Sequence, residues 1–183
     1  GQTVEVCGGV ITRVSKTDEK DRAAEAAARL PGKGRLLMPG LADCHMHTGQ
    51  QLLKGRVLDA LPMIWTRIML PFESTLTEEK MELSASLAAL KMIKSGTTAF
   101  VDAGSYYMET AADVYLKSGL RGLISASTMD EKGLPDSIAQ NADEAVAQTD
   151  RLYDGYHGKG NLKVAYSLRS LISCSDELMT KVS

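Results

Sequence analysis

The hydrophobic pattern divides the chain into two regions. In the first, valines alternate with polar positions over Val4–Val6, and a β-branched run follows over Val10–Val14. Alternation and β-branching are typical of strands, and the Gly8-Gly9 pair between the two runs predicts a tight turn. The first 38 residues are therefore expected to form a small β region that contains a hairpin.

From Pro39 onward, short apolar runs alternate with segments of helical character. This alternation is typical of βα units that build a parallel sheet. The expected strands span residues 41–44, 97–102, 120–125 and 162–166, and the expected helices span 61–70, 78–95, 109–117, 136–153 and 176–183.

Residue types at the helix ends support two of these bounds. Thr77 is a good N-cap, and Glu78 and Glu79 follow it at the positive end of the helix dipole. Gly96 suits the left-handed position that ends many helices. Pro71 is expected to end the preceding helix.

Four strands are half the number in a closed (β/α)8 barrel. The expected fold is therefore α/β, with the first half of such a barrel at residues 39–183. Part of a small β domain at residues 1–38 precedes it. The simplest explanation of this count is that the sequence is an N-terminal piece of a longer protein.

Composition narrows the classes of partner. The chain has 183 residues, with 21 Lys and Arg against 23 Asp and Glu, giving a formal net charge of −2. Such a balance argues against nucleic-acid and membrane-surface binding, and no apolar run approaches the ~20 residues that span a bilayer. Three widely spaced cysteines favour a reducing compartment, which predicts a cytoplasmic protein.

The candidate chemistry lies in His45 and His47, at the end of the first strand after Pro39. Side chains alternate along a strand, so both imidazoles project to the same side, where they can bind one metal ion. Met46 is expected to point the other way. The alternative is that both histidines are merely polar residues at a strand end.

Residues 39–47, with the sequence PGLADCHMH, resemble the PGxxDxHxH motif of the amidohydrolase superfamily. Residues 65–73, 95–102 and 118–121 resemble its chlorohydrolase and nucleoside-deaminase branch, which includes S-adenosylhomocysteine and methylthioadenosine deaminases. The resemblance as a whole extends over most of the chain. The resemblance implies a β-sandwich, here residues 1–38, followed by a metal-dependent (β/α)8 barrel, here residues 39–183.

The implied activity is hydrolysis at an sp2 carbon, usually deamination of an aminated heterocycle such as a purine, pyrimidine or nucleoside, by a metal-activated water. His45 and His47 would hold one divalent ion, zinc or alternatively iron. The resemblance places the other ligands and the proton-transfer groups on later strands, so the catalytic residues are expected beyond Ser183.

Three residues are candidates for substrate contacts. By resemblance, Glu73 would bind substrate hydroxyls, with a solvated loop carboxylate as the alternative. Arg169 stands where relatives commonly carry a histidine; it would suit an anionic group, unless it pairs with a neighbouring loop carboxylate. Trp65 would line the pocket or belong to the core.

Two alternatives to deamination remain open. The same fold could hydrolyse a cyclic amide or a carbon–chlorine bond, or the half-barrel could be catalytically incomplete and bind a partner or nothing. The expected partner is a small heterocyclic substrate, and a complete enzyme is expected to form homo-oligomers. The 183-residue chain alone is expected to be inactive.

Overall fold

The computed structural model describes residues 1–23, 25–26, 28–57 and 61–183. Within it the chain divides into two compact units, residues 1–39 and 40–183. Over the described residues, no helix combines the length and the apolar character needed to cross a bilayer.

The first unit is a β-hairpin followed by a short helix. Its elements are β1 (Gln2–Cys7), β2 (Val10–Lys16) and α1 (Glu19–Ala23). The strands pair antiparallel around the Gly8-Gly9 turn, where both glycines have positive φ angles. Glu5 lies opposite Arg13, whose Nη2 donates to the Glu5 carboxylate at 2.6 Å and also to Asp21 of α1. The predicted hairpin is confirmed.

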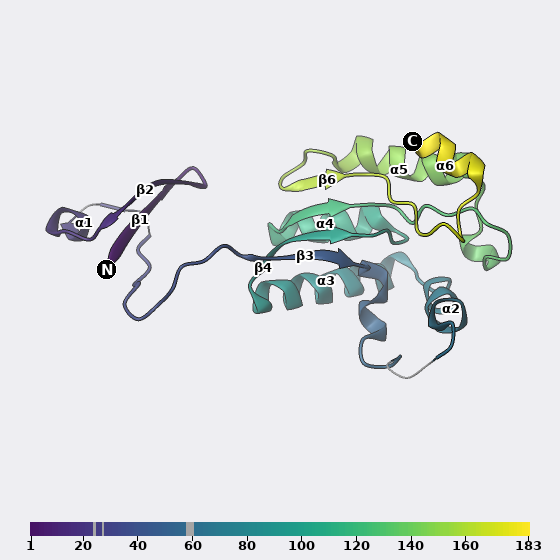
Figure 1. The fold of residues 1–183 in the computed structure, drawn as a ribbon, viewed down its shortest axis with the longest axis horizontal. Coiled ribbons are helices and arrows are strands. Elements are labelled where there is room, and N and C mark those ends of the chain that lie inside the picture. The colour runs from purple at the N-terminus through teal and green to yellow at the C-terminus, as the bar shows by residue number, and fades with distance from the viewer. Residues whose placement is uncertain (24, 27, 58–60) are drawn as a thin grey trace. The chain divides into compact units, whose positions relative to one another are not determined.

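The second unit is built on a parallel sheet whose four strands lie side by side in chain order (Figure 1). The strands are β3 (Leu41–Met46), β4 (Thr97–Asp102), β5 (Arg121–Ile124) and β6 (Leu162–Val164). The helical elements are η1 (Thr48–Leu53), η2 (Trp65–Met69), α2 (Leu70–Glu73), α3 (Glu78–Ser95), α4 (Met108–Ser118), η3 (Asp136–Ile138), α5 (Ala142–Tyr156) and α6 (Asp176–Val182).

Helices α3, α4 and α5 connect successive strands and pack against β4, β5 and β6 respectively (Figure 1). The main core lies between the sheet and these helices, because each presents its apolar side chains to the other. Its fully buried members include Met81, Ala85, Ala111, Tyr115, Ile124 and Leu162. This arrangement is the first part of a (β/α)8 barrel, as the sequence predicts.

The helix-end signals decide where α3 lies. Thr77 Oγ1 accepts a hydrogen bond from the Lys80 amide at 3.3 Å, and Gly96 ends the helix with φ of 80°. Pro71, by contrast, does not end the preceding helix. It is the second residue of α2, which continues directly from the π-helical turn η2, so the helical segment runs on to Glu73.

The predicted helix over 136–153 begins too early. A short 3₁₀ turn, η3, follows Pro135, and the α-helix itself begins at Ala142. Asn141 and Glu144 form a capping box, in which the Glu144 amide donates to Asn141 Oδ1 at 3.0 Å. The reciprocal hydrogen bond, from the Asn141 amide to Glu144, is 2.8 Å long. This pair fixes the start of α5 because it satisfies two otherwise free N–H groups.

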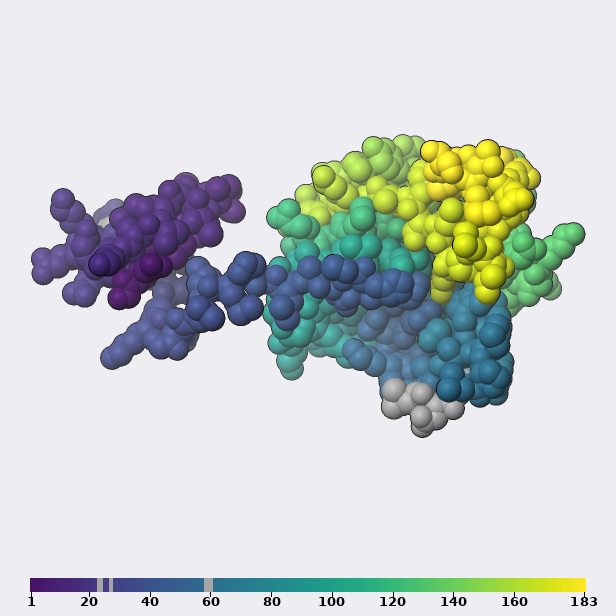
Figure 2. All heavy atoms as spheres, viewed as in Figure 1, coloured from purple at the N-terminus to yellow at the C-terminus, as the bar shows by residue number. Residues whose placement is uncertain are grey.

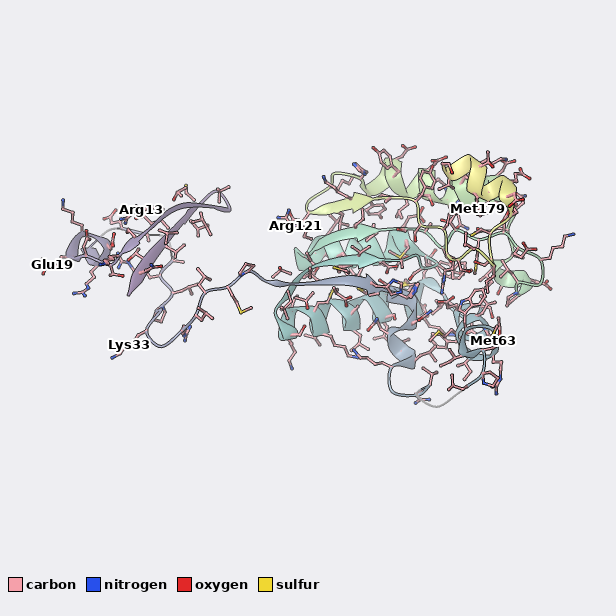
Figure 3. The ribbon with its side chains drawn as sticks, in the orientation of Figure 1. Arg13, Glu19, Lys33, Met63, Arg121 and Met179 are labelled. Atoms are coloured by element: carbon pink, nitrogen blue, oxygen red, sulfur yellow. The ribbon has the colours of Figure 1, made fainter. Side chains whose placement is uncertain are left out.

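The carboxyl ends of all four strands lie at one end of the sheet. Past the strands, two isolated parallel bridges, Ser105–Ala126 and Thr128–Leu168, hold the following loops together at that end. In Figure 3, Arg121 marks the amino end of β5, and Met179 lies on α6 towards the opposite end. Loops at the carboxyl ends are where parallel barrels place their functional residues.

Candidate active site

His45 and His47 lie at the carboxyl end of β3. Their ring centroids are 5.1 Å apart, and the rings are nearly perpendicular at 87°. Met46 between them is 7% exposed and belongs to the core shared with the helices. Strand alternation therefore places the two imidazoles together on the side of β3 away from this core.

His47 is the better anchored of the two. Its Nδ1 lies 3.0 Å from the carbonyl oxygen of Gly104. A carbonyl can only accept, so Nδ1 carries the proton and Nε2 keeps its lone pair for a metal ion. His45 is exposed, and its backbone N–H donates to the Asp43 carboxylate at 3.2 Å.

Burial lowers the pKa of His47, and the nearby positive charge of Arg169 acts in the same direction. The hydrogen bond to the Gly104 carbonyl and the charges of Asp102 and Glu73 oppose this shift. The neutral imidazole is the form that binds metals, so the lowered pKa suits His47 to that role.

His45 and His47 supply only part of a metal site. Catalytic zinc sites use three protein ligands and an open position, with histidine nitrogen among the preferred donors. Within the part of the chain that the structure describes, no group of three or more His, Cys, Asp or Glu side chains could hold an ion. His45 and His47 therefore fit as two ligands of a site that needs at least one more.

The third histidine, His157, lies elsewhere. It caps the end of α5, and its Nδ1 accepts a hydrogen bond from the Val164 amide at 3.2 Å. Its ring stacks on Tyr153, with centroids 4.2 Å apart. These contacts give His157 a local structural role.

Glu73 and Arg169 form a buried ion pair, with side chains 2% and 4% exposed. Arg169 Nη2 donates to both carboxylate oxygens, at 2.7 and 2.9 Å. Gln50 Nε2 from η1 adds a third hydrogen bond, at 2.7 Å. The alternative in which Glu73 is a solvated loop carboxylate is therefore wrong, because α2 folds it inward against the loop after β6.

Figure 2 shows the segments behind this pair: the C-terminal residues, in yellow, lie directly against the blue segment that contains α2. Arg169 Nη1 also donates to Ser127 Oγ at 3.0 Å and approaches the Gly104 carbonyl oxygen at 3.5 Å. That carbonyl is the same one that holds His47. The ion pair thus lies beside the candidate metal ligand.

Trp65 is half-buried in η2. It packs against a second core cluster formed by Leu70, Tyr106, Met129, Ile138, Ala142, Ala145, Cys174 and Leu178. The structure thus gives Trp65 core contacts, and its contact with substrate stays a prediction.

Gln50, Gly104 and Ser127 were not anticipated from the sequence. No sequence motif marks Gln50 or Ser127, because their hydrogen-bond partners are distant in the sequence. Gly104 offers one signal: a glycine two residues after a strand-ending aspartate suits an unusual backbone angle. Its φ is 102°, and a Cβ there would lie 2.9 Å from the Ala126 carbonyl oxygen.

Comparison with known proteins agrees with this geometry. Residues 36–183 match the model of the amidohydrolase family. The chain belongs to the amidohydrolase family. The resemblance in the HxH segment is thereby confirmed, and the parallel sheet with its helices is the first part of the amidohydrolase barrel.

Several curated amidohydrolases are similar to the chain. It is 30% identical over 94% of its length to a 5-methylthioadenosine/S-adenosylhomocysteine deaminase of Desulforamulus reducens, covering 39% of that protein. It is 32% identical over 98% of its length to a 5'-deoxyadenosine deaminase of Methanosarcina mazei, covering 40%. The chain thus spans about two fifths of the length of these relatives.

Solved structures show the same likeness. A zinc-bound adenosine deaminase from Xanthomonas campestris is 26% identical, with a TM-score of 0.79 over 99% of this chain and 41% of its own. A guanine deaminase from C. acetobutylicum with bound guanine has a TM-score of 0.81 over 99% of this chain and 44% of its own. At 22% identity, that second likeness supports the fold alone.

Proposed function

We propose that this amidohydrolase chain supplies the first metal ligands and part of the substrate pocket of a deaminase that acts on an aminated heterocycle. The observation that carries the proposal is the adjacent pair of His45 and His47. The hydrogen bond to the Gly104 carbonyl uses Nδ1 of His47, which leaves Nε2 as the atom that can bind a metal ion. Deaminases among the similar proteins support the reaction class.

A divalent ion at this site would lower the pKa of a bound water towards neutrality, which creates a nucleophile for the aminated carbon. His45 and His47 would hold the ion, and His47 would stay neutral because burial lowers its pKa. Zinc is the proposed metal because imidazole is among its preferred ligands and a zinc-bound adenosine deaminase is similar in structure, with iron as the alternative.

The ion pair limits how Glu73 can contact a substrate. Its carboxylate already accepts three hydrogen bonds, from Arg169 and Gln50, and only 2% of the side chain is exposed. A sugar diol would have to displace Arg169 before binding it. We therefore place a heterocyclic base ahead of its nucleoside as substrate, with Glu73, Arg169 and Trp65 bordering the pocket.

The test uses the full-length gene product that contains residues 1–183. Ammonia release is measured for adenine, guanine and cytosine, for their nucleosides, and for a cyclic amide and a chlorinated triazine as controls. We expect release from at least one base, and at least a 100-fold loss in His45→Ala and His47→Ala. Release of chloride or ring opening without ammonia would overturn the proposal, as would full activity in both variants.

Two broader features belong to the same proposal. Cys7, Cys44 and Cys174 are all free thiols, which supports a reducing compartment such as the cytoplasm.

We also propose that the complete enzyme is a homo-oligomer. Light scattering on the purified full-length product would show a single-subunit mass if that is wrong.

A further inference from the structure

Asp102 stands out among the buried polar residues of the second unit. It ends β4, its side chain is 0% exposed, and it makes no ion pair in the described part of the chain. A buried carboxylate is costly unless hydrogen bonds satisfy it. The residues that donate hydrogen bonds to Asp102 indicate its structural role.

Every donor to Asp102 belongs either to Thr48, the first residue of η1, or to the loop that follows β4. Oδ2 accepts from the Thr48 amide at 2.9 Å and from the Thr48 hydroxyl. Oδ1 accepts from the Gly104 amide at 2.9 Å and from Ser105 Oγ at 3.3 Å. One carboxylate therefore ties the residue after His47 to the residue whose carbonyl holds His47.

The bonded atoms leave the imidazole little freedom. Asp102 accepts a hydrogen bond from the Gly104 amide, and the Gly104 carbonyl accepts a hydrogen bond from His47 Nδ1 at 3.0 Å. A second connection runs through Ser105, whose Oγ accepts from the Gly49 amide at 3.2 Å. Further support comes from Ser84 Oγ, which donates to the Thr48 carbonyl at 2.6 Å, and from Tyr115, whose hydroxyl lies 2.6 Å from Thr48 Oγ1.

From this network we infer that Asp102 is a positioning residue for the candidate metal ligand. It holds the Gly104 carbonyl where it selects the His47 tautomer with hydrogen on Nδ1, and so directs the Nε2 lone pair to the metal position. The inference rests on the proposed function only in assigning His47 to a metal. The tautomer itself belongs to the metal-free protein.

Asp102→Asn tests the inference, because it keeps the shape but replaces one acceptor oxygen with a donor. In metal-free full-length protein labelled with ¹⁵N-histidine, we expect His47 to change from the Nδ1–H tautomer to a mixture. Zinc affinity, measured by chelator competition, should fall by about 10-fold to 100-fold, the usual effect of losing such outer contacts.

Leu152→Ala is the matched control, because Leu152 is 1% exposed in α5 and its apolar side chain makes none of the hydrogen bonds to Asp102, Gly104 or His47. It should lower the melting temperature while leaving the His47 tautomer and zinc affinity unchanged. If Asp102→Asn fails to fold, Ser105→Ala removes one of the four hydrogen bonds and should shift both readouts in the same direction by less.

An unchanged tautomer and zinc affinity in the folded Asp102 variant, or in Ser105→Ala where that variant alone folds, would overturn the inference. These outcomes are separate from the proposed function. A protein that keeps the tautomer response but releases no ammonia would contradict only the deaminase assignment.

Discussion

At the scale of single residues, Glu73 and Arg169 illustrate a buried charge whose partner is distant in sequence. They are 96 residues apart, yet both side chains are almost fully enclosed. Removing one member of such a pair leaves an uncompensated charge, and this is more harmful than replacing both. The pair is therefore a sensitive point for the stability of the fold.

Arg169→Ala is expected to destabilise the protein by about 3 to 5 kcal/mol, because it leaves the Glu73 carboxylate buried without its cation. The double variant Glu73→Gln with Arg169→Met should recover much of this loss. Urea unfolding of the three proteins provides the measurement. A single variant as stable as the parent would show that the pair is not enclosed as described.

His47 should make stability fall in acid. Its pKa is lowered in the folded protein by burial, so below about pH 6.5 the unfolded state binds a proton that the folded state resists. The free energy of unfolding therefore decreases as the pH drops from 7 to 5. In metal-free protein the decrease should be steeper than in His47→Gln, and equal slopes would contradict the assignment.

At the scale of elements, the sequence predicts the structure well wherever the signals are local. The hairpin, the strands of the sheet and the cap residues Thr77 and Gly96 depend on neighbouring residues, and these predictions are confirmed. The helix around Pro71 and the start of α5 were wrong. Pro71 lies in a helical segment that runs on from the π-helical turn η2 to Glu73, and the Asn141–Glu144 capping box outweighs the earlier Asp136.

Two glycines, one in a strand and one in a helix, differ in the space around them. A Cβ on Gly122 in β5 would lie 2.5 Å from Phe100 Cζ, whereas one on Gly155 in α5 would meet nothing within 4 Å. We expect Gly122→Ala to cost about 1 to 3 kcal/mol through overpacking, and Gly155→Ala to stabilise the helix by about 0.5 to 1 kcal/mol. Thermal unfolding would show shifts of opposite sign; shifts of the same sign would contradict the packing.

At the scale of the whole molecule, the motif around His45 and His47 could be recognised because its two members are neighbours on one strand. The environment that completes it could not, since Gln50, Gly104 and Ser127 act through contacts made only once the sheet has formed. Sequence spacing identifies such a ligand pair, whereas its hydrogen-bond partners require the three-dimensional arrangement of the strand ends.

Residues 1–183 alone are expected to bind zinc weakly and to release no measurable ammonia from any substrate. The described residues offer only two clustered histidine ligands, and groups that act as a unit lose almost all activity when some are missing. Isothermal titration with zinc and a coupled ammonia assay are the measurements. Turnover near that of the full-length product would show that the ligand assignment is wrong.

The buried Glu73–Arg169 pair also has an evolutionary consequence. Loops at the strand ends can ordinarily change specificity while the core between sheet and helices keeps the protein folded. This pair joins the two requirements, because each member neutralises the other and, in the proposed function, would border the pocket. A lineage that altered substrate choice here would have to exchange both positions together, or pass through an intermediate too unstable to persist.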